Sequence, residues 1–189
     1  MIKKSIRIAN CSGFYGDKLA VAREMVEGGP IDVLTGDYLA ELTMTILYGQ
    51  KMKRGEDHGY VGTFIKQFRD VAKLTEEKRI KIVTNAGGLN PASMASAIQD
   101  IVKELNLNLK VAYIDGDDLM PRINDFFRDG EKLINIDKNM PLDSYDKKPI
   151  TANAYLGAWG IKEALNNGAD VVICPRVTDA AVVIGPAAW

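Results

Sequence analysis

Polar side chains that can bind or activate a small molecule follow the predicted strands at five places in this chain. These clusters are rich in Asn, Asp, Thr and Gly, and they occupy residues 10–17, 35–37, 84–90, 115–118 and 175–179. In open α/β sheets, the loops at the carboxyl ends of the strands meet at one edge, where helix N-termini present free N–H groups. We therefore expect the five clusters to form one small-molecule site at that edge.

Three side chains in these clusters are the candidate catalytic groups. Asp37 ends the second cluster and can serve as an acid or base, a metal ligand or a hydroxyl anchor. Asn85 can donate a hydrogen bond to an oxyanion or a carboxylate, and Arg176 can bind a carboxylate bidentately. Structural roles compete with these functions, because Asp37 can cap the following helix and Arg176 can pair with Asp179.

The remaining candidates are expected to bind or surround the substrate. They are Asn10, Ser12, Asp17, Thr35, Gly87, Gly88, Asn90, Asn153, Thr178 and Asp179. The adjacent Gly87 and Gly88 allow backbone N–H groups to approach an anion, with Asn85 beside them. The alternative is a tight turn in which Asn90 caps a helix that starts at Pro91. Neither the spacing of a Walker A loop nor that of a dinucleotide fingerprint is present.

An acidic cluster and a small set of thiols and imidazole complete the candidates. Asp115, Asp117 and Asp118 can hold Mg²⁺ together with water, or they form a solvated turn. We predict no cofactor, with Mg²⁺ at these aspartates as the alternative. Two cysteines and one histidine are too few for a zinc site made of Cys and His, and we expect both cysteines to be buried.

Short apolar runs alternate with amphipathic stretches along the chain, which predicts βα units. The expected strands are residues 5–10, 31–34, 80–84, 109–114 and 170–174. The expected helices are residues 18–27, 38–53, 60–77, 91–105, 119–128 and 152–166. This pattern predicts one α/β domain over residues 1–189, with a mainly parallel sheet and helices on both faces, in a Rossmann-like, doubly wound arrangement. Residues 130–149 have no clear period, so we interpret them as an irregular excursion or a lid.

Composition restricts the partners that this chain can have. Its 189 residues are 47% apolar and 26% charged, with a net charge of −1. Nucleic acid is not an expected partner, because there is no excess of basic residues to neutralise phosphates. No apolar run approaches the roughly 20 residues that span a bilayer. The first residues lack the apolar core of a signal peptide, so we expect a cytoplasmic protein that does not bind membranes.

Six strings of this sequence together resemble the acyclic terpene utilisation (AtuA) family. They are IANCSGFYGD at 8–17, GGPIDVLTGDYLAELT at 28–43, VTNAGGLNP at 83–91, ITANAYLGA at 150–158, RVTDA at 176–180 and GPAAW at 185–189. The strings are long, ordered and unusual, and they cover essentially the whole chain. Family members continue beyond the length of this chain, and residues 185–189 form an apolar end without a polar tail. The resemblance therefore implies the N-terminal part of a longer protein.

The resemblance also implies a catabolic function. The family takes its name from a bacterial pathway that degrades citronellol- and geraniol-type compounds through CoA thioesters, so we expect a carboxylic acid or an acyl-CoA as substrate. Hydratase, lyase or isomerase chemistry suits a site rich in Asp, Asn and Thr without a nucleophile–base pair or a redox cofactor motif. The alternatives are a non-catalytic binding or scaffolding subunit of a multi-chain complex and a metal-dependent hydrolase. We expect either a homo-oligomer or a separate partner subunit.

Overall fold

A parallel five-stranded sheet is the centre of the fold in the computed structural model, which describes residues 5–189. The strands are β1 (Ile8–Asn10), β2 (Val33–Gly36), β3 (Lys81–Thr84), β4 (Val111–Tyr113) and β5 (Val171–Ile173). Their order across the sheet is β1-β2-β3-β5-β4, and all four pairings are parallel. The predicted α/β fold class is confirmed.

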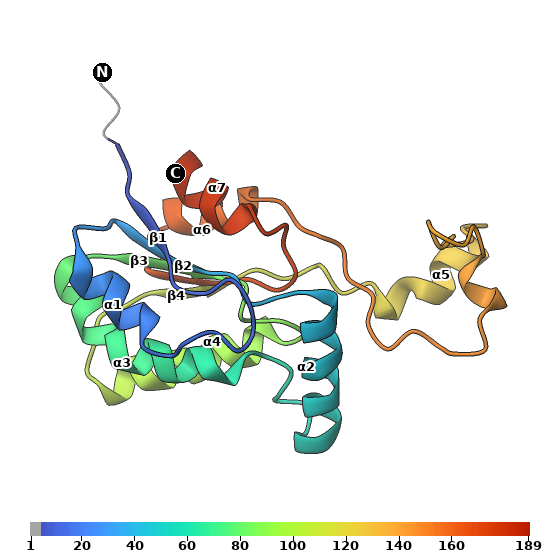
Figure 1. The fold of residues 1–189 in the computed structure, drawn as a ribbon, viewed down its shortest axis with the longest axis horizontal. Helices are drawn as coiled ribbons and strands as arrows, with labels where there is room; N and C mark the ends of the chain where they lie inside the picture. Colours follow the sequence, from blue (N-terminus) through green and yellow to red (C-terminus); the bar gives the residue numbers. More distant parts are fainter. Residues whose placement is uncertain (1–4) are drawn as a thin grey trace.

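Helices cover both faces of this sheet (Figure 1). The chain contains α1 (Val21–Gly28), α2 (Glu41–Arg54), α3 (Gly62–Lys78), α4 (Pro91–Glu104), α5 (Ile123–Arg128), α6 (Trp159–Asn166) and α7 (Ala181–Ala188). One face carries α1, α3 and α4, and the opposite face carries α6 and α7 (Figure 1). The helices can pack on both faces because the strand side chains alternate. Leu34 and Ile82 belong to the larger core beneath the sheet, while Val33 and Val83 belong to the smaller core under α6 and α7.

β3 and β5 are neighbours in the sheet, but the chain that follows each of them runs to a different face of the sheet. The chain leaves β3 for α4 on one face, whereas it leaves β5 for α7 on the other face (Figure 1). In doubly wound folds, ligands bind at the carboxyl ends of adjacent strands whose connections diverge in this way, and we call this region of the sheet the crevice. The turns that begin at Asn85 and Cys174 border this crevice.

Two segments near the end of the chain differ from the sequence prediction. A helix was expected from residue 152, but α6 begins only at Trp159. Residues 152–158 run extended because Leu156 N–H donates to the Arg176 carbonyl at 3.2 Å, and Thr178 N–H donates to the Leu156 carbonyl at 2.9 Å. Tertiary pairing therefore overrides local helix propensity in this segment.

The second difference is α7, a helix that the sequence did not indicate. Residues 181–188 contain no charged side chain and include Gly185 and Pro186, a pair that usually marks a turn. A short helix without a polar face lacks the period by which amphipathic helices are recognised. Gly185 allows α7 to lie against α6, because a Cβ there would come within 2.5 Å of Ile161 Cγ2.

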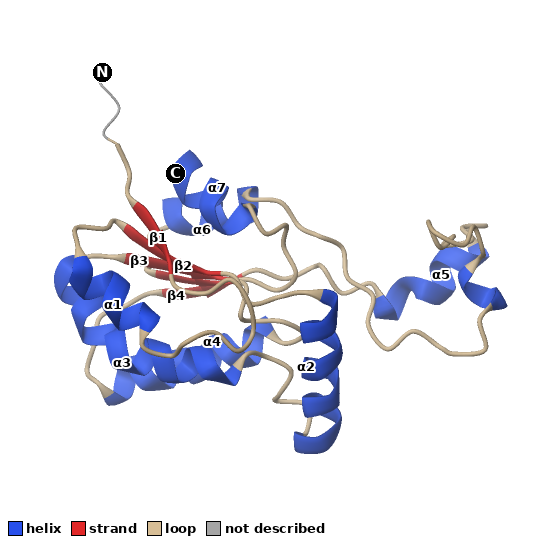
Figure 2. Cartoon of the chain, viewed as in Figure 1, coloured by secondary structure: helices blue, strands red, loops and turns tan. Residues whose placement is uncertain are grey.

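Residues 119–150 form a small lobe that extends beyond the carboxyl edge of the sheet. It contains the 3₁₀ turns Met120–Arg122 and Leu142–Ser144 together with α5. Figure 2 shows the lobe joined to the sheet by two loop segments, with α2 between the lobe and the other helices. The predicted irregular excursion thus projects away from the strand ends in this conformation. None of the helices within residues 5–189 is long and apolar enough to cross a membrane.

Candidate functional site

A carboxylate and an amide lie side by side at the ends of β2 and β3. Asn85 is fully buried, and its Nδ2 donates to Asp37 Oδ1 at 2.6 Å. Its Oδ1 accepts the backbone N–H of Tyr38 at 2.8 Å, so the amide is held in one orientation. Burial raises the pKa of Asp37 above its ordinary value, and this effect outweighs the hydrogen bond from Asn85. The structure therefore brings together two of the three predicted catalytic residues.

Arg176 lies at the end of β5, on the other side of the crevice. Only 4% of this residue is exposed. Its Nη1 donates to Asp179 Oδ1 at 2.9 Å and to the carbonyl oxygens of Leu39 at 3.2 Å and Val177 at 3.3 Å. Its Nε is buried and has no hydrogen-bond partner among residues 5–189. An unsatisfied buried donor is costly, so this atom indicates where an acceptor can bind.

The two sides of the crevice interact electrostatically. Asp179 raises the pKa of Asp37, whereas the positive charge of Arg176 lowers it. Burial lowers the pKa of Arg176, but Tyr155 and Asp179 raise it by more, so the guanidinium remains charged. A permanent positive charge therefore lies near a carboxyl group that is easier to protonate than a free aspartate.

Tyr155 and Glu41 are site residues that the sequence did not identify. The Tyr155 ring centre lies 4.0 Å from the guanidinium carbon of Arg176, a cation–π contact. The Tyr155 hydroxyl donates to Glu41 Oε1 at the start of α2, and this hydrogen bond lowers the pKa of Glu41. Residues 152–158 were predicted to be helical, which hid this contact. Both residues nevertheless fall inside the strings 28–43 and 150–158.

A second carboxylate–amide pair, Asp117 and Asn153, lies next to the backbone of Arg176. Asp117 is 4% exposed, and its Oδ2 accepts both Asn153 Nδ2 at 2.8 Å and the backbone N–H of Arg176 at 3.1 Å. Asn153 therefore holds the extended segment 152–158 and the β5 turn together, rather than pointing at a ligand. Asp118 instead caps the turn at Met120, whose N–H it accepts at 2.9 Å.

The three aspartates of the predicted magnesium alternative have different surroundings. The described residues contain no group of three or more His, Cys, Asp or Glu side chains that could hold a metal ion. Of the three aspartates in the cluster, Asp117 is turned inward to Asn153 and Arg176, whereas Asp115 is exposed. The sequence could not separate a ligand cluster from a turn, because both have the same spacing.

The polar side chains of the turn after β1 form hydrogen bonds within the turn and to β2. Thr35 Oγ1 donates to Asn10 Oδ1 at 3.0 Å, and Asn10 Nδ2 donates to the Ser12 carbonyl at 2.8 Å. Ser12 Oγ donates to the Phe14 carbonyl at 3.0 Å, while Asp17 Oδ2 accepts a backbone N–H at 2.9 Å. These predicted substrate-binding residues form a network that shapes the β1 turn.

The two adjacent glycines do not form the predicted anion cradle. The N–H of Gly87 donates to the Cys174 carbonyl at 3.1 Å, and that of Gly88 donates to the Asn85 carbonyl at 3.2 Å. Glycine is required at both positions for space. A Cβ on Gly87 would lie 2.6 Å from the Cys174 carbonyl oxygen, and one on Gly88 would lie 2.4 Å from Leu47 Cδ1. The turn interpretation is therefore the one that the hydrogen bonds support.

Asn90 and Thr178 have different surroundings. Asn90 caps α4, because its Oδ1 accepts the Ser93 N–H at 3.1 Å, while its Nδ2 donates to the Glu56 carbonyl at 2.7 Å. This confirms the helix cap that competed with a binding role. Thr178 is exposed beside Asp179, so its side chain faces solvent next to the crevice.

The two thiols are buried, as predicted. Burial raises the pKa of Cys11 to about 11 and also raises the pKa of Cys174. Both cysteines are free. A thiol with a raised pKa is protonated at neutral pH and is a poor nucleophile, so the site depends on carboxylate, amide and guanidinium groups.

Comparison with known proteins assigns the chain to a family. Residues 6–189 match the family model described as acyclic terpene utilisation family protein AtuA. No curated protein and no solved structure matches the chain. The match spans essentially all of the sheet, the crevice and the lobe, and it includes each turn that contributes to the Asp37–Asn85–Arg176 site. This chain therefore belongs to the acyclic terpene utilisation family AtuA.

Proposed function

We propose that this chain carries the substrate site of a cytoplasmic catabolic enzyme, or of an enzyme subunit, that acts on a carboxylic acid or an acyl-CoA. Family membership supports a part in acyclic terpene utilisation. The observation that carries the proposal is the unpartnered Nε of the buried Arg176, which lies across the crevice from Asp37. A buried, charged donor without an acceptor suits an anionic substrate.

Arg176 binds the carboxylate of the substrate in this proposal. All side-chain hydrogen bonds of Arg176 to described residues are made by Nη1. The edge formed by Nε and Nη2 therefore remains for a ligand, and this edge matches the two oxygens of a carboxylate. Tyr155 and Asp179 hold the guanidinium in place, so little side-chain entropy is lost on binding.

Asp37 transfers the proton. Its raised pKa brings the carboxyl group closer to neutral pH, where a general acid or base works best. Asn85 fixes the carboxyl by donating from Nδ2 to Oδ1 of Asp37. Proton transfer next to an activated carbonyl is the common step of hydratases, lyases and isomerases, which are the reaction classes that we favour.

A charge-conserving substitution tests the carboxylate clamp. Arg176→Lys keeps the positive charge but removes the planar two-nitrogen edge, and we expect it to weaken binding of a carboxylate ligand about tenfold. Isothermal titration with a panel of branched-chain acids and acyl-CoAs measures this effect. Arg69→Lys is the matched control, because Arg69 pairs with Glu104 on the surface. Equal affinities for wild type and Arg176→Lys would contradict the clamp.

Replacing Asp37 with asparagine separates catalysis from binding. The change is isosteric and retains an oxygen that can accept from Asn85, but it cannot transfer a proton. We expect turnover to fall about 100-fold or more, while ligand affinity changes little. Wild-type turnover in Asp37→Asn would remove Asp37 from the mechanism. If the purified wild-type protein binds these ligands but does not turn them over, the result would instead support a non-catalytic binding subunit.

A further inference from the structure

The tip of the lobe presents an apolar side chain to water. Ile136 is 97% exposed. The tip is nevertheless an ordered turn, because Asn135 Oδ1 accepts the N–H groups of Asp137 at 3.1 Å and Lys138 at 2.8 Å. The Asn135 carbonyl also accepts the Asn139 N–H at 2.9 Å. The turn therefore holds Ile136 outward, where contact of its apolar side chain with water is unfavourable in free energy.

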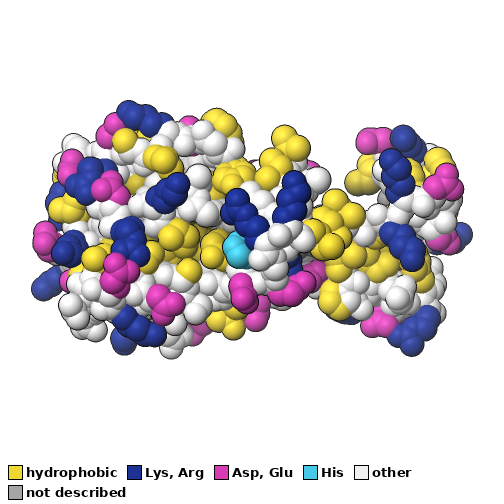
Figure 3. Space-filling view, turned by 90° about the horizontal axis from the view of Figure 1, so that it is seen from below, with side chains coloured by type: hydrophobic (Ala, Val, Ile, Leu, Met, Phe, Trp, Pro, Cys, Tyr) yellow, Lys and Arg dark blue, Asp and Glu magenta, His cyan; other side chains and the backbone are white. Residues whose placement is uncertain are grey.

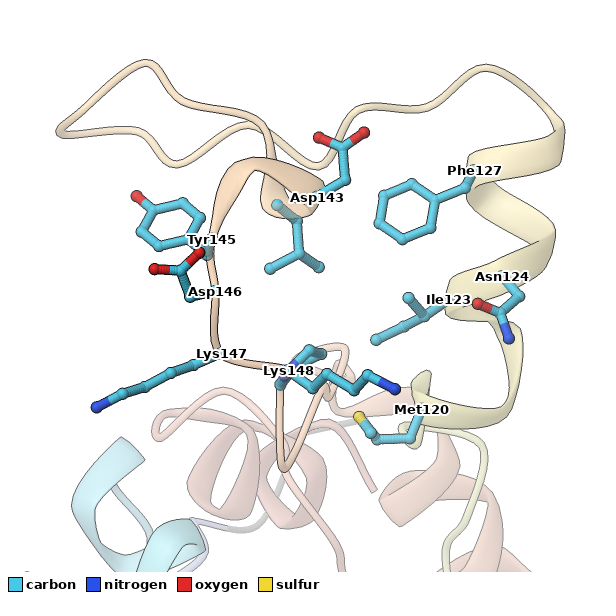
Figure 4. Close-up of a pocket in the computed structure, with 11 residues that line it drawn as sticks. Met120, Ile123, Asn124, Phe127, Asp143, Tyr145, Asp146, Lys147 and Lys148 are labelled. Atoms are coloured by element: carbon cyan, nitrogen blue, oxygen red, sulfur yellow. The ribbon is translucent and has the colours of Figure 1, made fainter.

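The same lobe also contains a cavity. It measures about 440 Å³ and lies between α5 and residues 142–149. Figure 4 shows Ile123 and Phe127 pointing into this space from α5, with Tyr145 on the opposite wall. Leu142 and Met120 add further apolar lining. Because the cavity opens to solvent, a second apolar surface can enter it and cover its apolar lining.

The lobe has almost no core of its own. Within residues 120–149, Ile123 is the only buried side chain, and the whole tip from residue 131 to 140 is exposed. Segments shorter than about 40 residues usually need a disulfide, a metal or association with another chain to hold their structure. The two cysteines lie outside the lobe, in the sheet turns. Figure 3 shows a gap between part of the lobe and the main body.

We propose that two copies of this chain associate through their lobes, with the Ile136 tip of each copy in the cavity of the other. A surface that carries both a projection and a matching hollow is self-complementary, and a two-fold axis satisfies both contacts at once. Each copy then fills the other's cavity and removes an exposed isoleucine from water. This inference is independent of the proposed reaction, because no residue of the crevice takes part.

The charges around the two surfaces are consistent with this pairing. Asp137 lies beside Ile136 at the tip, and Lys147 and Lys148 line the cavity. Opposite charges at the rim of an apolar contact set its register and suppress other partners.

The oligomeric state of the purified chain tests the proposal. Analytical ultracentrifugation should find a dimer at roughly 100 µM, where micromolar and tighter dimers are populated. Ile136→Asp should raise the dissociation constant about tenfold or more, because each dimer contains two tips. Since Ile136 makes almost no contact within its own chain, this substitution leaves the fold intact.

A matched control distinguishes the tip from any exposed apolar residue. Ile184 is 51% exposed on α7, far from the lobe in sequence, and Ile184→Asp should leave the dissociation constant within about twofold. A monomeric wild type would overturn the proposal, and so would a dimer that Ile184→Asp weakens and Ile136→Asp does not. Native mass spectrometry adds a further check, because a monomer carrying a small molecule that Phe127→Ser releases would assign the cavity to a ligand instead.

Discussion

The Asp37 carboxyl illustrates how neighbouring residues change the acidity of a side chain in a turn. Its pKa is raised by burial, while Asn85 holds one oxygen and Arg176 lies across the crevice. Each of these residue types is common after a strand, and each has a structural role available to it. Their proposed function depends on being near one another, since burial, charges and hydrogen bonds shift a pKa only at the group on which they act.

The raised pKa of Asp37 predicts how stability depends on pH. The folded state holds the proton more tightly than the unfolded chain, so the native state is progressively disfavoured as pH rises through the folded pKa. Asp37→Asn removes this cost. We expect the free energy of unfolding of the variant, relative to wild type, to increase as pH rises from strongly acidic to neutral, as measured by urea denaturation.

A surface aspartate with the opposite shift provides the control for this experiment. The hydrogen bond from Arg23 lowers the pKa of Asp70. Asp70→Asn should therefore become slightly more destabilising as pH rises, because the stabilising charged form is lost. Parallel pH profiles for the two variants would mean that burial does not control Asp37.

At the scale of elements, the turn between β3 and α4 packs closely against the neighbouring elements of the crevice. Gly88 adopts a φ of +55°, and the turn is pressed against α2 through Leu47 and against the Gly59 carbonyl. Gly87 lies equally close to the end of β5. These approaches set the separation between Asn85 and Arg176, so the glycines contribute to the site by packing rather than by binding an anion.

Gly88→Ala should destabilise the protein. The added Cβ occupies a left-handed conformation and collides with Leu47, and we expect a loss of about 1–3 kcal/mol in the free energy of unfolding. Gly28→Ala is a suitable comparison, because Gly28 ends α1 with nothing within 4 Å of its Cβ position and should change stability little. Equal denaturation midpoints for the two variants would show that the turn can relax without cost.

At the scale of the whole molecule, stability is divided unequally between the sheet and the lobe. The sheet lies between two apolar cores, whereas the lobe contains one buried side chain in residues 120–149. Regions with little apolar burial open with the lowest free energies. We therefore expect the lobe to open at a lower free energy than the sheet.

Hydrogen exchange can measure this difference. Backbone amides of residues 131–149 should exchange much faster than those of β3 and β5, and dilution that dissociates the proposed dimer should accelerate exchange in the lobe alone. Mass spectrometry of peptic fragments at two protein concentrations resolves both effects. Lobe protection equal to that of the sheet at the lower concentration would show that the lobe is stable by itself.

The sequence by itself determined the parallel α/β fold, the strand ends at which the polar clusters lie, and the family. It could do so because strand alternation, the Asn90–Pro91 helix start and the long strings are local properties of the chain. It also made Asp37, Asn85 and Arg176 candidates, because their residue types suit acid–base and carboxylate chemistry.

Only the tertiary structure decided which of those groups lie together. In the structure, Asn10, Ser12 and Asp17 form hydrogen bonds that stabilise the β1 turn. Asp117 accepts the backbone N–H of Arg176, and the Tyr155 ring packs on the guanidinium. The tertiary structure also formed α7 without a polar face and kept residues 152–158 extended. These outcomes depend on hydrogen bonds and close packing between distant segments, which spacing along the chain does not encode.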